Sequence, residues 1–419
     1  MDKTTGIRIA GRYTLFTHIP VWQGADGRIH TDALWQRDLE AHLTYLPGFH
    51  LCCPVVDGPD PGADTAPVDG LAPEQVQPLR RDGGWGSVLA NLLPNALAMA
   101  RAVAGSDIVH SGTAGWAYPH SYLILALRPF RRFRWIVLME SSPWAIEGGA
   151  AARGRASLRQ RMGHAFHGFM VRRCLRAADI RIFTHDRYRR DYYGGHDSTL
   201  VAPAVWVEER QLVGEDALEA RLGARRQEPV RLLVPARMTA DKGLETILAA
   251  IDLAGPRLAA SPAEIDEEAS LVVDFIGAGE MAPAVERFAA TRRPGIATRY
   301  YAPLPYGAPF LDFMAGYDAI VLANRRAEQP RIVYDAFAQG LPCLTSRTPG
   351  TEGIVTEGAT GRFFPIDDAD ALATLLVEAA AMRPALPAIA RAARAAAAAR
   401  SHAAMHTERA TFLAKNLHP

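Results

Sequence analysis

The chain has 419 residues, enough for about two to three compact domains, and 49% of its residues are apolar. Its 46 Lys and Arg nearly balance 45 Asp and Glu, so the formal net charge is +1 and no overall positive field favours nucleic acid. These values predict a globular protein that does not bind nucleic acid.

The N-terminus and the cysteines both predict a cytoplasmic location. Residues 1–16 lack the sustained apolar region of a secretory signal, and apolar stretches such as 121–130 are interrupted by arginine well before the ~18 residues that a membrane span needs. The four cysteines show no metal-ligand spacing and no disulfide framework. We expect reduced thiols in the core, no membrane span and residence in the cytoplasm.

Short apolar runs recur along the first half of the chain, and each is followed by a longer helical pattern. This alternation is typical of βαβ units with a parallel sheet. We therefore predict a Rossmann-like domain over residues 1–208, with strands at 12–18, 49–56, 107–112, 134–140 and 180–185.

A glycine loop follows the first run. Asp26, Gly27 and Arg28 form its centre. Such a loop can close over phosphate groups or can be a surface turn, and the sequence leaves both interpretations open.

The segment 128–176 is the most basic part of the chain. Eleven arginines face two acids there, Glu140 and Glu147, a local excess of nine positive charges. The favoured interpretation is a solvated helix face. The alternative is a surface that attracts an anionic acceptor or contacts the inner face of the membrane peripherally, where lipid-linked saccharides are built.

The charged segment 208–229 has no strand pattern and predicts a domain boundary. The βαβ pattern then resumes, which predicts a second Rossmann-like domain over 228–385, with strands at 230–236, 271–279, 297–304, 317–324 and 342–346. The Ala-rich segment 386–419 predicts C-terminal helices that pack back toward the first domain. Ligands of doubly wound sheets bind outside the carboxyl ends of the strands, so a cleft between the two domains is the expected site.

Two cations follow the first strand of the second domain. In "VPARMTADKG", Arg237 ends the strand, Lys242 comes five residues later and Gly243 opens a helix. Two positive charges beside a helix N-terminus can bind one anion and suit a diphosphate. They can equally be surface cations beside a simple turn.

A Gly-x-Gly follows the next strand. Gly277 and Gly279 in "FIGAGE" would let backbone approach a ligand, but the third glycine of a dinucleotide fingerprint is absent. By itself the motif favours a plain turn between strand and helix.

Two acids flank the start of a later helix in "EQPRIVYDAF". Glu328 lies at the mouth of the sheet, and Asp335 falls inside a helix that begins near Pro330, a residue suited to a first turn. The backbone N–H groups of Arg331 and Ile332 would add the positive end of that helix.

These motifs, with "YDAIVLAN" and "EGATGRFF", occur in an order and at separations that resemble the C-terminal domain of the GT-B retaining glycosyltransferases of family four. The resemblance covers about residues 230–380 well. It is looser across the first half, where it depends on "SDIVHSG" and the glycine loop. It implies a GT-B fold, two Rossmann-like doubly wound parallel-sheet domains facing across a cleft.

The resemblance also implies roles for individual residues. Arg237 and Lys242 match the cations that hold the donor diphosphate, and Asp335 matches the carboxylate that binds the ribose hydroxyls. Glu328 is the nearest match to the acid beside the transferred sugar. Leu304 lies where the family's backbone reads the base, and His110 matches a histidine that faces the reacting centre, a role for which His120 competes.

The sequence departs from the family pattern in two places. Six residues separate Glu328 and Asp335 where the family usually has seven, and its glycine-rich sugar loop is reduced to "TPGTEG" at 348–353. The acids at 368–370 resemble a metal-binding DxD motif, but they open a helical run, where capping is expected. We predict no required metal.

The predicted function is glycan or glycoconjugate biosynthesis by a metal-independent, hexosyltransferase-like enzyme. It would move a sugar from a nucleoside-diphosphate sugar, its co-substrate, to an acceptor hydroxyl with retention of anomeric configuration, and no other cofactor is expected. The acceptor is a saccharide, a lipid-linked saccharide or a small molecule. The alternatives are a non-catalytic sugar-nucleotide scaffold and a sugar-nucleotide epimerase of the same fold.

Overall fold

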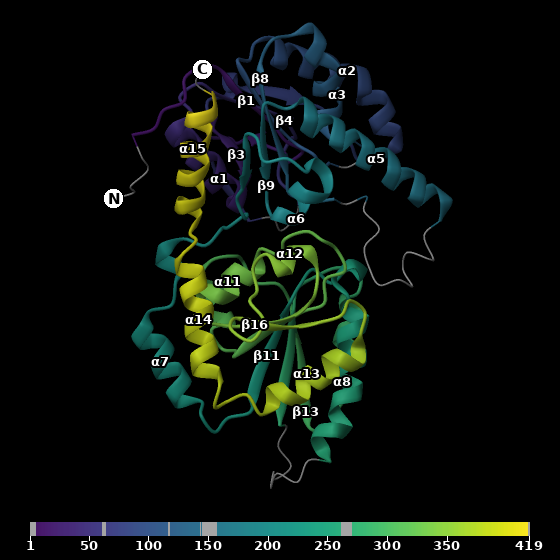
Figure 1. The fold of residues 1–419 in the computed structure, drawn as a ribbon, viewed down its shortest axis with the longest axis vertical. Helices are drawn as coiled ribbons and strands as arrows, with labels where there is room; N and C mark the ends of the chain where they lie inside the picture. The colour runs from purple at the N-terminus through teal and green to yellow at the C-terminus, as the bar shows by residue number, and fades with distance from the viewer. Residues whose placement is uncertain are drawn as a thin grey trace. The chain divides into compact units, whose positions relative to one another are not determined.

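The computed structural model describes residues 6–60, 64–115, 118–142, 144, 157–260 and 270–417. They form two compact units (Figure 1). The first unit contains the described residues up to Trp144, then Leu158–Ala204 and the segment from His402 onward, and the second contains Val205–Ser401. The charged segment 208–229 therefore lies inside the second unit.

A seven-stranded parallel sheet forms the centre of the first unit. Its order is β10-β9-β8-β7-β1-β4-β6, which is the doubly wound arrangement with the reversal between β1 and β7. The strands are β1 (Tyr13–Phe16), β4 (Phe49–Pro54), β6 (Val76–Leu79), β7 (Ile108–Gly112), β8 (Arg134–Met139), β9 (Ile180–Phe183) and β10 (Thr199–Val201). All five predicted runs are strands.

Helices cover the first sheet, and a small antiparallel sheet adjoins it. The small sheet pairs β2 (Trp22–Gln23), β3 (Ile29–Asp32) and β5 (Thr65–Pro67). The helical elements are η1 (Pro73–Gln75), α1 (Ala33–Tyr45), α2 (Trp85–Ala104), α3 (His120–Leu127), η2 (Arg128–Phe130), α5 (Leu158–Ala177), α6 (Asp186–Tyr188), η3 (Arg189–Tyr193) and α15 (His402–Leu417). Asp32 caps α1 by accepting hydrogen bonds from the N–H groups of Leu34 and Trp35.

The second unit contains a six-stranded parallel sheet in the order β13-β12-β11-β14-β15-β16. This is the Rossmann order, with the reversal between β11 and β14. The strands are β11 (Val230–Pro235), β12 (Leu271–Ile276), β13 (Ile296–Tyr301), β14 (Ala319–Leu322), β15 (Cys343–Ser346) and β16 (Gly361–Phe364). The sequence thus correctly predicted the fold class, two doubly wound parallel-sheet units.

Both faces of the second sheet are buried. Val230, Leu232 and Val234 of β11 pack into one core and Leu233 into the other, because successive strand side chains point to opposite faces. Helices therefore cover both sides: η4 (Glu209–Gln211), α7 (Glu215–Ala224), η5 (Ala240–Lys242), α8 (Leu244–Ala259), α9 (Ala282–Ala289), α10 (Ala308–Met314), α11 (Ile332–Ala338), α12 (Pro349–Glu352), α13 (Ala369–Ala380) and α14 (Leu386–Ala398).

Three local predictions can be compared with the structure directly. Asp368 caps α13 by accepting a hydrogen bond from the Ala371 N–H, so the capping interpretation of 368–370 is confirmed. All four cysteines are buried and free. The described part of the Ala-rich segment, residues 386–417, forms two helices, of which α14 contacts α11 and α7 in the second unit and α15 contacts α1 in the first.

One described helix, α2, is long and apolar enough to cross a membrane, judged by length and composition alone. Its sequence does not stand out as a span, because serine, asparagine and glycine dilute the apolar residues of this uncharged stretch, residues 85–100.

Candidate active site

The reversal of strand order in the second sheet brings together the loops that follow β11 and β14. These strands are hydrogen-bonded neighbours, so their carboxyl ends lie side by side. Lys242, after β11, donates a hydrogen bond from Nζ to Oε1 of Glu328, after β14, at 2.9 Å. Two residues that the sequence assigned to one donor site therefore contact each other directly.

Backbone contacts hold the loop that carries Arg237 and Lys242 against the loop after β12. The N–H of Met238 donates to the Ala278 carbonyl, and the N–H of Met281 donates back to the Met238 carbonyl, each at 2.8 Å. A Cβ at Gly277 or Gly279 would collide with the backbone of Ala236 or Met238. These glycines are required by this loop contact, a structural reason that stands beside the predicted approach to a ligand.

The same loop is also joined to the loop after β14. Gly243 has φ +63°, and a Cβ there would collide with the Ala323 carbonyl. The N–H of Arg325 donates to the Asp241 carbonyl at 3.0 Å. The three loops at the carboxyl edge of β11, β12 and β14 thus form one connected backbone surface.

The charge of this surface is mostly positive. Arg237 is exposed, Lys242 is partly buried and Arg326 lies 3.9 Å from Asp241. Burial alone would raise the pKa of Asp241, but the Thr239 hydroxyl that donates to it and the nearby cations lower that pKa overall. The carboxylate therefore stays ionised and orients the cations around it.

The backbone of Glu328 lies against the reduced glycine segment. A Cβ at Gly350, in α12, would collide with the carbonyl oxygens of Ala327 and Glu328. The "TPGTEG" sequence therefore supports the loop that presents Glu328, whatever contact it makes with a sugar.

Asp335 is buried in α11, and its Oδ1 accepts a hydrogen bond from the Tyr306 hydroxyl at 2.7 Å. Tyr306 lies in the loop after β13, two residues beyond Leu304, which is exposed. At the start of α11, the Arg331 guanidinium lies over the Trp206 ring, 4.9 Å from its centroid. Ile332 is the first residue of α11. Tyr306 and Trp206 are contacts that no pattern in the sequence predicted.

In the first unit, Gly27 occupies the turn between β2 and β3 with φ +76°. Its carbonyl accepts a hydrogen bond from the Gln23 side chain at 3.0 Å. Arg28 forms an ion pair with Asp69, and Asp26 accepts from His30 at 3.0 Å. The glycine loop is therefore a hairpin turn whose charged side chains have partners within the unit.

His110 is buried in β7, and its Nδ1 is hydrogen-bonded to the Tyr13 hydroxyl at 2.6 Å. Burial lowers the pKa of His110 well below its ordinary value. The ring is therefore neutral and forms part of the core beneath the sheet.

A pair of histidines lies where the strand order of the first sheet reverses. His18 follows β1 and His120 follows β7, and the rings stack with centroids 3.7 Å apart. Burial lowers the pKa of His18 to about 4 and that of His120 well below its usual value. Among the described residues, neither Nε2 of His18 nor Nδ1 of His120 has a hydrogen-bond partner. The sequence signal for this pair was weak, since His18 ends the predicted strand 12–18 and His120 lies eight residues beyond the predicted strand 107–112.

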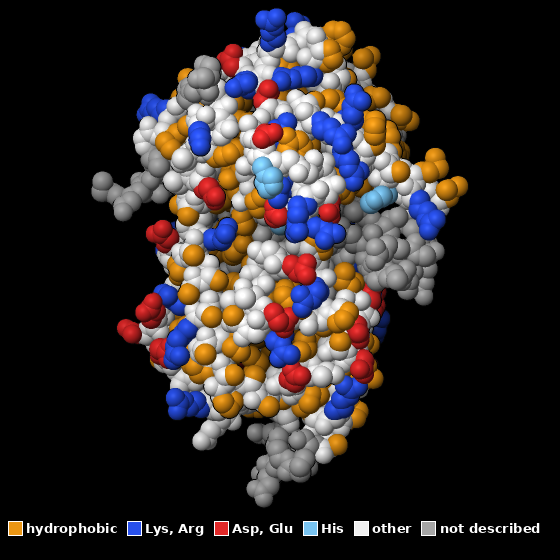
Figure 2. All heavy atoms as spheres, viewed as in Figure 1, with side chains coloured by type: hydrophobic (Ala, Val, Ile, Leu, Met, Phe, Trp, Pro, Cys, Tyr) orange, Lys and Arg blue, Asp and Glu red, His pale blue; other side chains and the backbone are white. Residues whose placement is uncertain are grey.

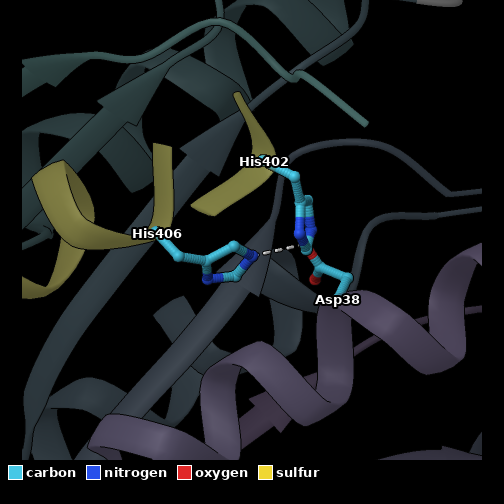
Figure 3. Close-up of side chains that lie close together, drawn as sticks. All are labelled: Asp38, His402 and His406. Carbon is cyan, nitrogen blue, oxygen red and sulfur yellow. Dashed lines mark hydrogen bonds and ion pairs between the residues drawn. The ribbon is translucent and has the colours of Figure 1, made fainter. Parts of the chain in front are cut away.

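One cluster elsewhere in the first unit has the composition of a metal site. His402 and His406 of α15 both point toward Asp38 of α1 (Figure 3), and their ligand atoms all lie within 4.8 Å of one another. Yet Nε2 of His406 donates to Asp38 at 3.1 Å, and His42, also beside Asp38, contacts the buried Arg409 guanidinium at 3.2 Å. The carboxylate and the guanidinium already balance in charge, and a divalent cation would leave buried positive charge uncompensated. We interpret the cluster as a hydrogen-bonded contact that joins α15 to α1.

Comparison with known proteins bears on the fold and on the second unit. Residues 229–382 match the family described as Glycosyl transferases group 1. No curated protein matches the chain in sequence.

Solved structures match over nearly the whole chain. HepE of Anabaena, in complex with UDP and glucose, has 12% identity and a TM-score of 0.62 and covers 96% of this chain and 98% of its own. Sucrose-phosphate synthase from Thermosynechococcus elongatus has 16% identity and a TM-score of 0.66, with 97% and 98% covered. A glycosyltransferase from Rickettsia africae has 14% identity and a TM-score of 0.59, with 96% and 98% covered.

The sheet orders and the structural matches show a fold of the GT-B type. Within that fold, the second unit is the part that matches the group 1 glycosyl transferases. The resemblance to family four in particular remains a prediction.

Proposed function

We propose that the chain transfers a hexose from a nucleoside-diphosphate sugar to an acceptor hydroxyl with retention of anomeric configuration. The observation that carries the proposal is the contact between Lys242 and Glu328 at the reversal of the second sheet, beside Arg237. Similar structures support a nucleotide-sugar donor, since HepE is solved with UDP-glucose.

In the proposed reaction, the bond from the anomeric carbon to the diphosphate breaks, a bond to the acceptor oxygen forms, and the hydroxyl proton passes to the departing diphosphate. Negative charge grows on the departing diphosphate. Arg237 and Lys242 stabilise it there, because cations already in position act most strongly where charge develops. These two side chains take the place of a metal ion in this scheme, and no cofactor beyond the co-substrate is proposed.

The remaining donor contacts follow from the same surface. Asp335 accepts hydrogen bonds from the ribose hydroxyls. These bonds replace, or are added to, the hydrogen bond that the Tyr306 hydroxyl donates to Asp335. The backbone near Leu304 contacts the base, and the N–H groups around Gly277, Gly279, Arg331 and Ile332 line the phosphates. Glu328 faces the transferred sugar once the phosphate has drawn Lys242 away.

For the acceptor side we propose that a histidine of the first unit faces the reacting centre. The sequence favours His110, and Gly27 lies in the loop proposed to approach the donor. The pair of His18 and His120 is the competing assignment, favoured by its place at the reversal of strand order.

The acceptor class stays open among saccharides, lipid-linked saccharides and small molecules. We propose a cytoplasmic enzyme that works peripherally at the inner face of the membrane. Of the charged residues in the basic segment 128–176, Glu147, Arg153 and Arg155 lie outside the described residues.

Two experiments test the proposal. A thermal-shift panel of uridine, guanosine, adenosine and thymidine diphosphates identifies the donor base, because a ligand that binds only the folded state raises its apparent stability. Diphosphate release from the matching nucleotide sugars, with and without acceptors, then tests transfer, and the anomeric configuration of the product tests retention. Binding without transfer or hydrolysis indicates the scaffold, and conversion of the donor without any acceptor indicates the epimerase.

A further inference from the structure

Helix α2 presents an apolar stripe to solvent. Five large side chains recur three or four residues apart along it and are exposed: Trp85, Leu89, Leu92, Leu93 and Leu97. Leu89 and Leu93 are 72% and 68% exposed. Other side chains of the same helix, among them Val88, Met99 and Val103, are buried, so α2 is packed against the unit and the stripe is the part of it that faces solvent.

Helix α5 carries a second stripe of the same kind. Leu158, Met162, Phe166 and Phe169 also recur at helical spacing, and Phe166 and Phe169 are 56% and 57% exposed. The buried side of α5 begins only at Gly168, so its first half has no buried residue. Two amphipathic helices thus expose their apolar faces, where a globular surface usually carries isolated apolar side chains.

The two stripes belong to one layer of helices. Helix α3 contacts both α2 and α5, and η2, at its end, carries Phe130, which is 77% exposed. Figure 2 shows hydrophobic side chains in orange gathered along the edge where Figure 1 places α2 and the outer end of α5, with blue cationic side chains nearby.

Arginines accompany this layer, and acids are almost absent from it. Helix α5 has five arginines and no Asp or Glu, and two more follow Phe130. All seven are exposed: Arg131, Arg132, Arg159, Arg161, Arg172, Arg173 and Arg176. An apolar stripe flanked by arginines matches an anionic bilayer, where apolar side chains enter the acyl boundary and guanidinium groups meet phosphates.

We propose that the exposed stripes of α2 and α5, with Phe130 and the flanking arginines, form a surface that binds an anionic lipid bilayer in the plane of the interface. Helix α2 lies on the bilayer and does not cross it, because a crossing would remove Val88, Met99 and Val103 from the core of the unit. The charge complementarity favours lipid over an apolar protein partner. The inference does not depend on the proposed donor chemistry.

Co-sedimentation of the full chain with vesicles tests the proposal. We expect binding to phosphatidylcholine vesicles that contain phosphatidylglycerol, weaker binding to phosphatidylcholine alone, and partial loss of binding at high salt, since salt screens only the charge contribution. Equal binding at all lipid compositions would overturn the role of the arginines. No binding to either vesicle would overturn the whole surface.

Matched variants locate the surface. The double variant Leu93→Gln with Phe166→Gln should bind vesicles at least about tenfold more weakly, because two apolar side chains no longer enter the acyl boundary. Leu253→Gln, at an exposed leucine of α8, should bind like the parent. Arg159→Gln with Arg161→Gln should weaken binding about fivefold for each arginine lost, against no change for Arg287→Gln with Arg292→Gln.

Two controls distinguish lipid binding from misfolding and from self-association. Circular dichroism and thermal midpoints must match the parent, which is expected because every substituted side chain is exposed. If the apolar double variant changes the oligomeric state and leaves vesicle binding intact, the stripes bind a second copy and the proposal is wrong. Diphosphate release from a soluble donor is measured in parallel, so failure of lipid binding and failure of sugar transfer are distinguished.

Discussion

The ammonium of Lys242 lies 2.9 Å from a carboxylate oxygen of Glu328, and this contact joins loops that follow two neighbouring strands. Both side chains are partly buried, 15% and 28% exposed. A donor diphosphate and Glu328 would therefore compete for the same ammonium. We infer that donor binding breaks the ion pair and releases Glu328 toward the sugar.

Lys242→Ala should reduce turnover by about two to three orders of magnitude, because the ammonium group is lost from the place where negative charge develops. Stability should change by no more than about 1 kcal/mol, as is typical of a partly exposed ion pair. Lys415→Ala, at an exposed lysine of α15, is the matched control. Steady-state kinetics and thermal midpoints check both expectations, and unchanged turnover would remove the diphosphate role of Lys242.

Glu328→Gln should separate binding from turnover. The amide no longer competes for Lys242, so the nucleoside diphosphate should bind somewhat more tightly while turnover falls. Glu286→Gln, on the exposed face of α9, should change neither. Titration calorimetry and diphosphate release measure the two quantities, and a parallel loss of both would indicate that Glu328 supports the loop and does not act on the sugar.

The central strands were predictable because they are buried on both faces and therefore appear as unbroken apolar runs. The structure adds β6 and β10 at the edges of the first sheet, β16 at one edge of the second, and the short antiparallel strands β2, β3 and β5. Edge strands need fewer apolar residues, and β6 contains Pro78, which weakens any strand signal.

The candidate site was predictable as a set of residues and not as a set of contacts. Lys242 was assigned to the donor diphosphate and Glu328 to a catalytic role beside the transferred sugar, and no pattern in the sequence says that they pair with each other. Tyr306 was missed because it lies in a loop, and its contact with Asp335 depends on how β13 and α11 are placed. The glycines at 277 and 279 were interpreted through a ligand, whereas the neighbouring loop already requires them.

Asp335→Asn should weaken binding of the preferred nucleoside diphosphate by about 10- to 100-fold, the cost of losing hydrogen bonds to a charged acceptor. Tyr306→Phe keeps the carboxylate and should have a much smaller effect. Asp312→Asn, on the exposed face of α10, is the control. Comparing a nucleoside diphosphate with its 2′-deoxy form checks the contact, since Asp335→Asn should remove most of the preference for the ribose form.

Variants of His110 and His120 should show which of the two histidines faces the reacting centre. His110→Ala removes the buried hydrogen-bond partner of the Tyr13 hydroxyl and should cost about 1–3 kcal/mol of stability. If His120 faces the reacting centre, His120→Ala should lower turnover at a thermal midpoint closer to that of the parent. Turnover lost in His110→Ala under conditions where the variant is fully folded would instead support His110.

The contact between His406 and Asp38 predicts a pH dependence of stability. Burial lowers the pKa of His406 to about 3 from 6.5, although its hydrogen bond to Asp38 opposes that shift. The unfolded chain therefore binds more protons than the folded chain between these values. The contribution of His406 to stability is complete above about pH 6.5 and is lost as the pH falls toward 3, with a slope of up to about 1.4 kcal/mol per pH unit.

His406→Phe should be less stable at neutral pH, because Asp38 loses a hydrogen-bond donor. Its stability should nevertheless fall less steeply between about pH 7 and pH 5, where Asp38 stays ionised in both states. Urea unfolding across that range measures the slope, and His164→Gln, at an exposed histidine of α5, should leave it unchanged. If the slope of His406→Phe equals that of the parent, His406 does not carry this linkage, and the other buried histidines, whose pKa values are also lowered, account for the acid sensitivity.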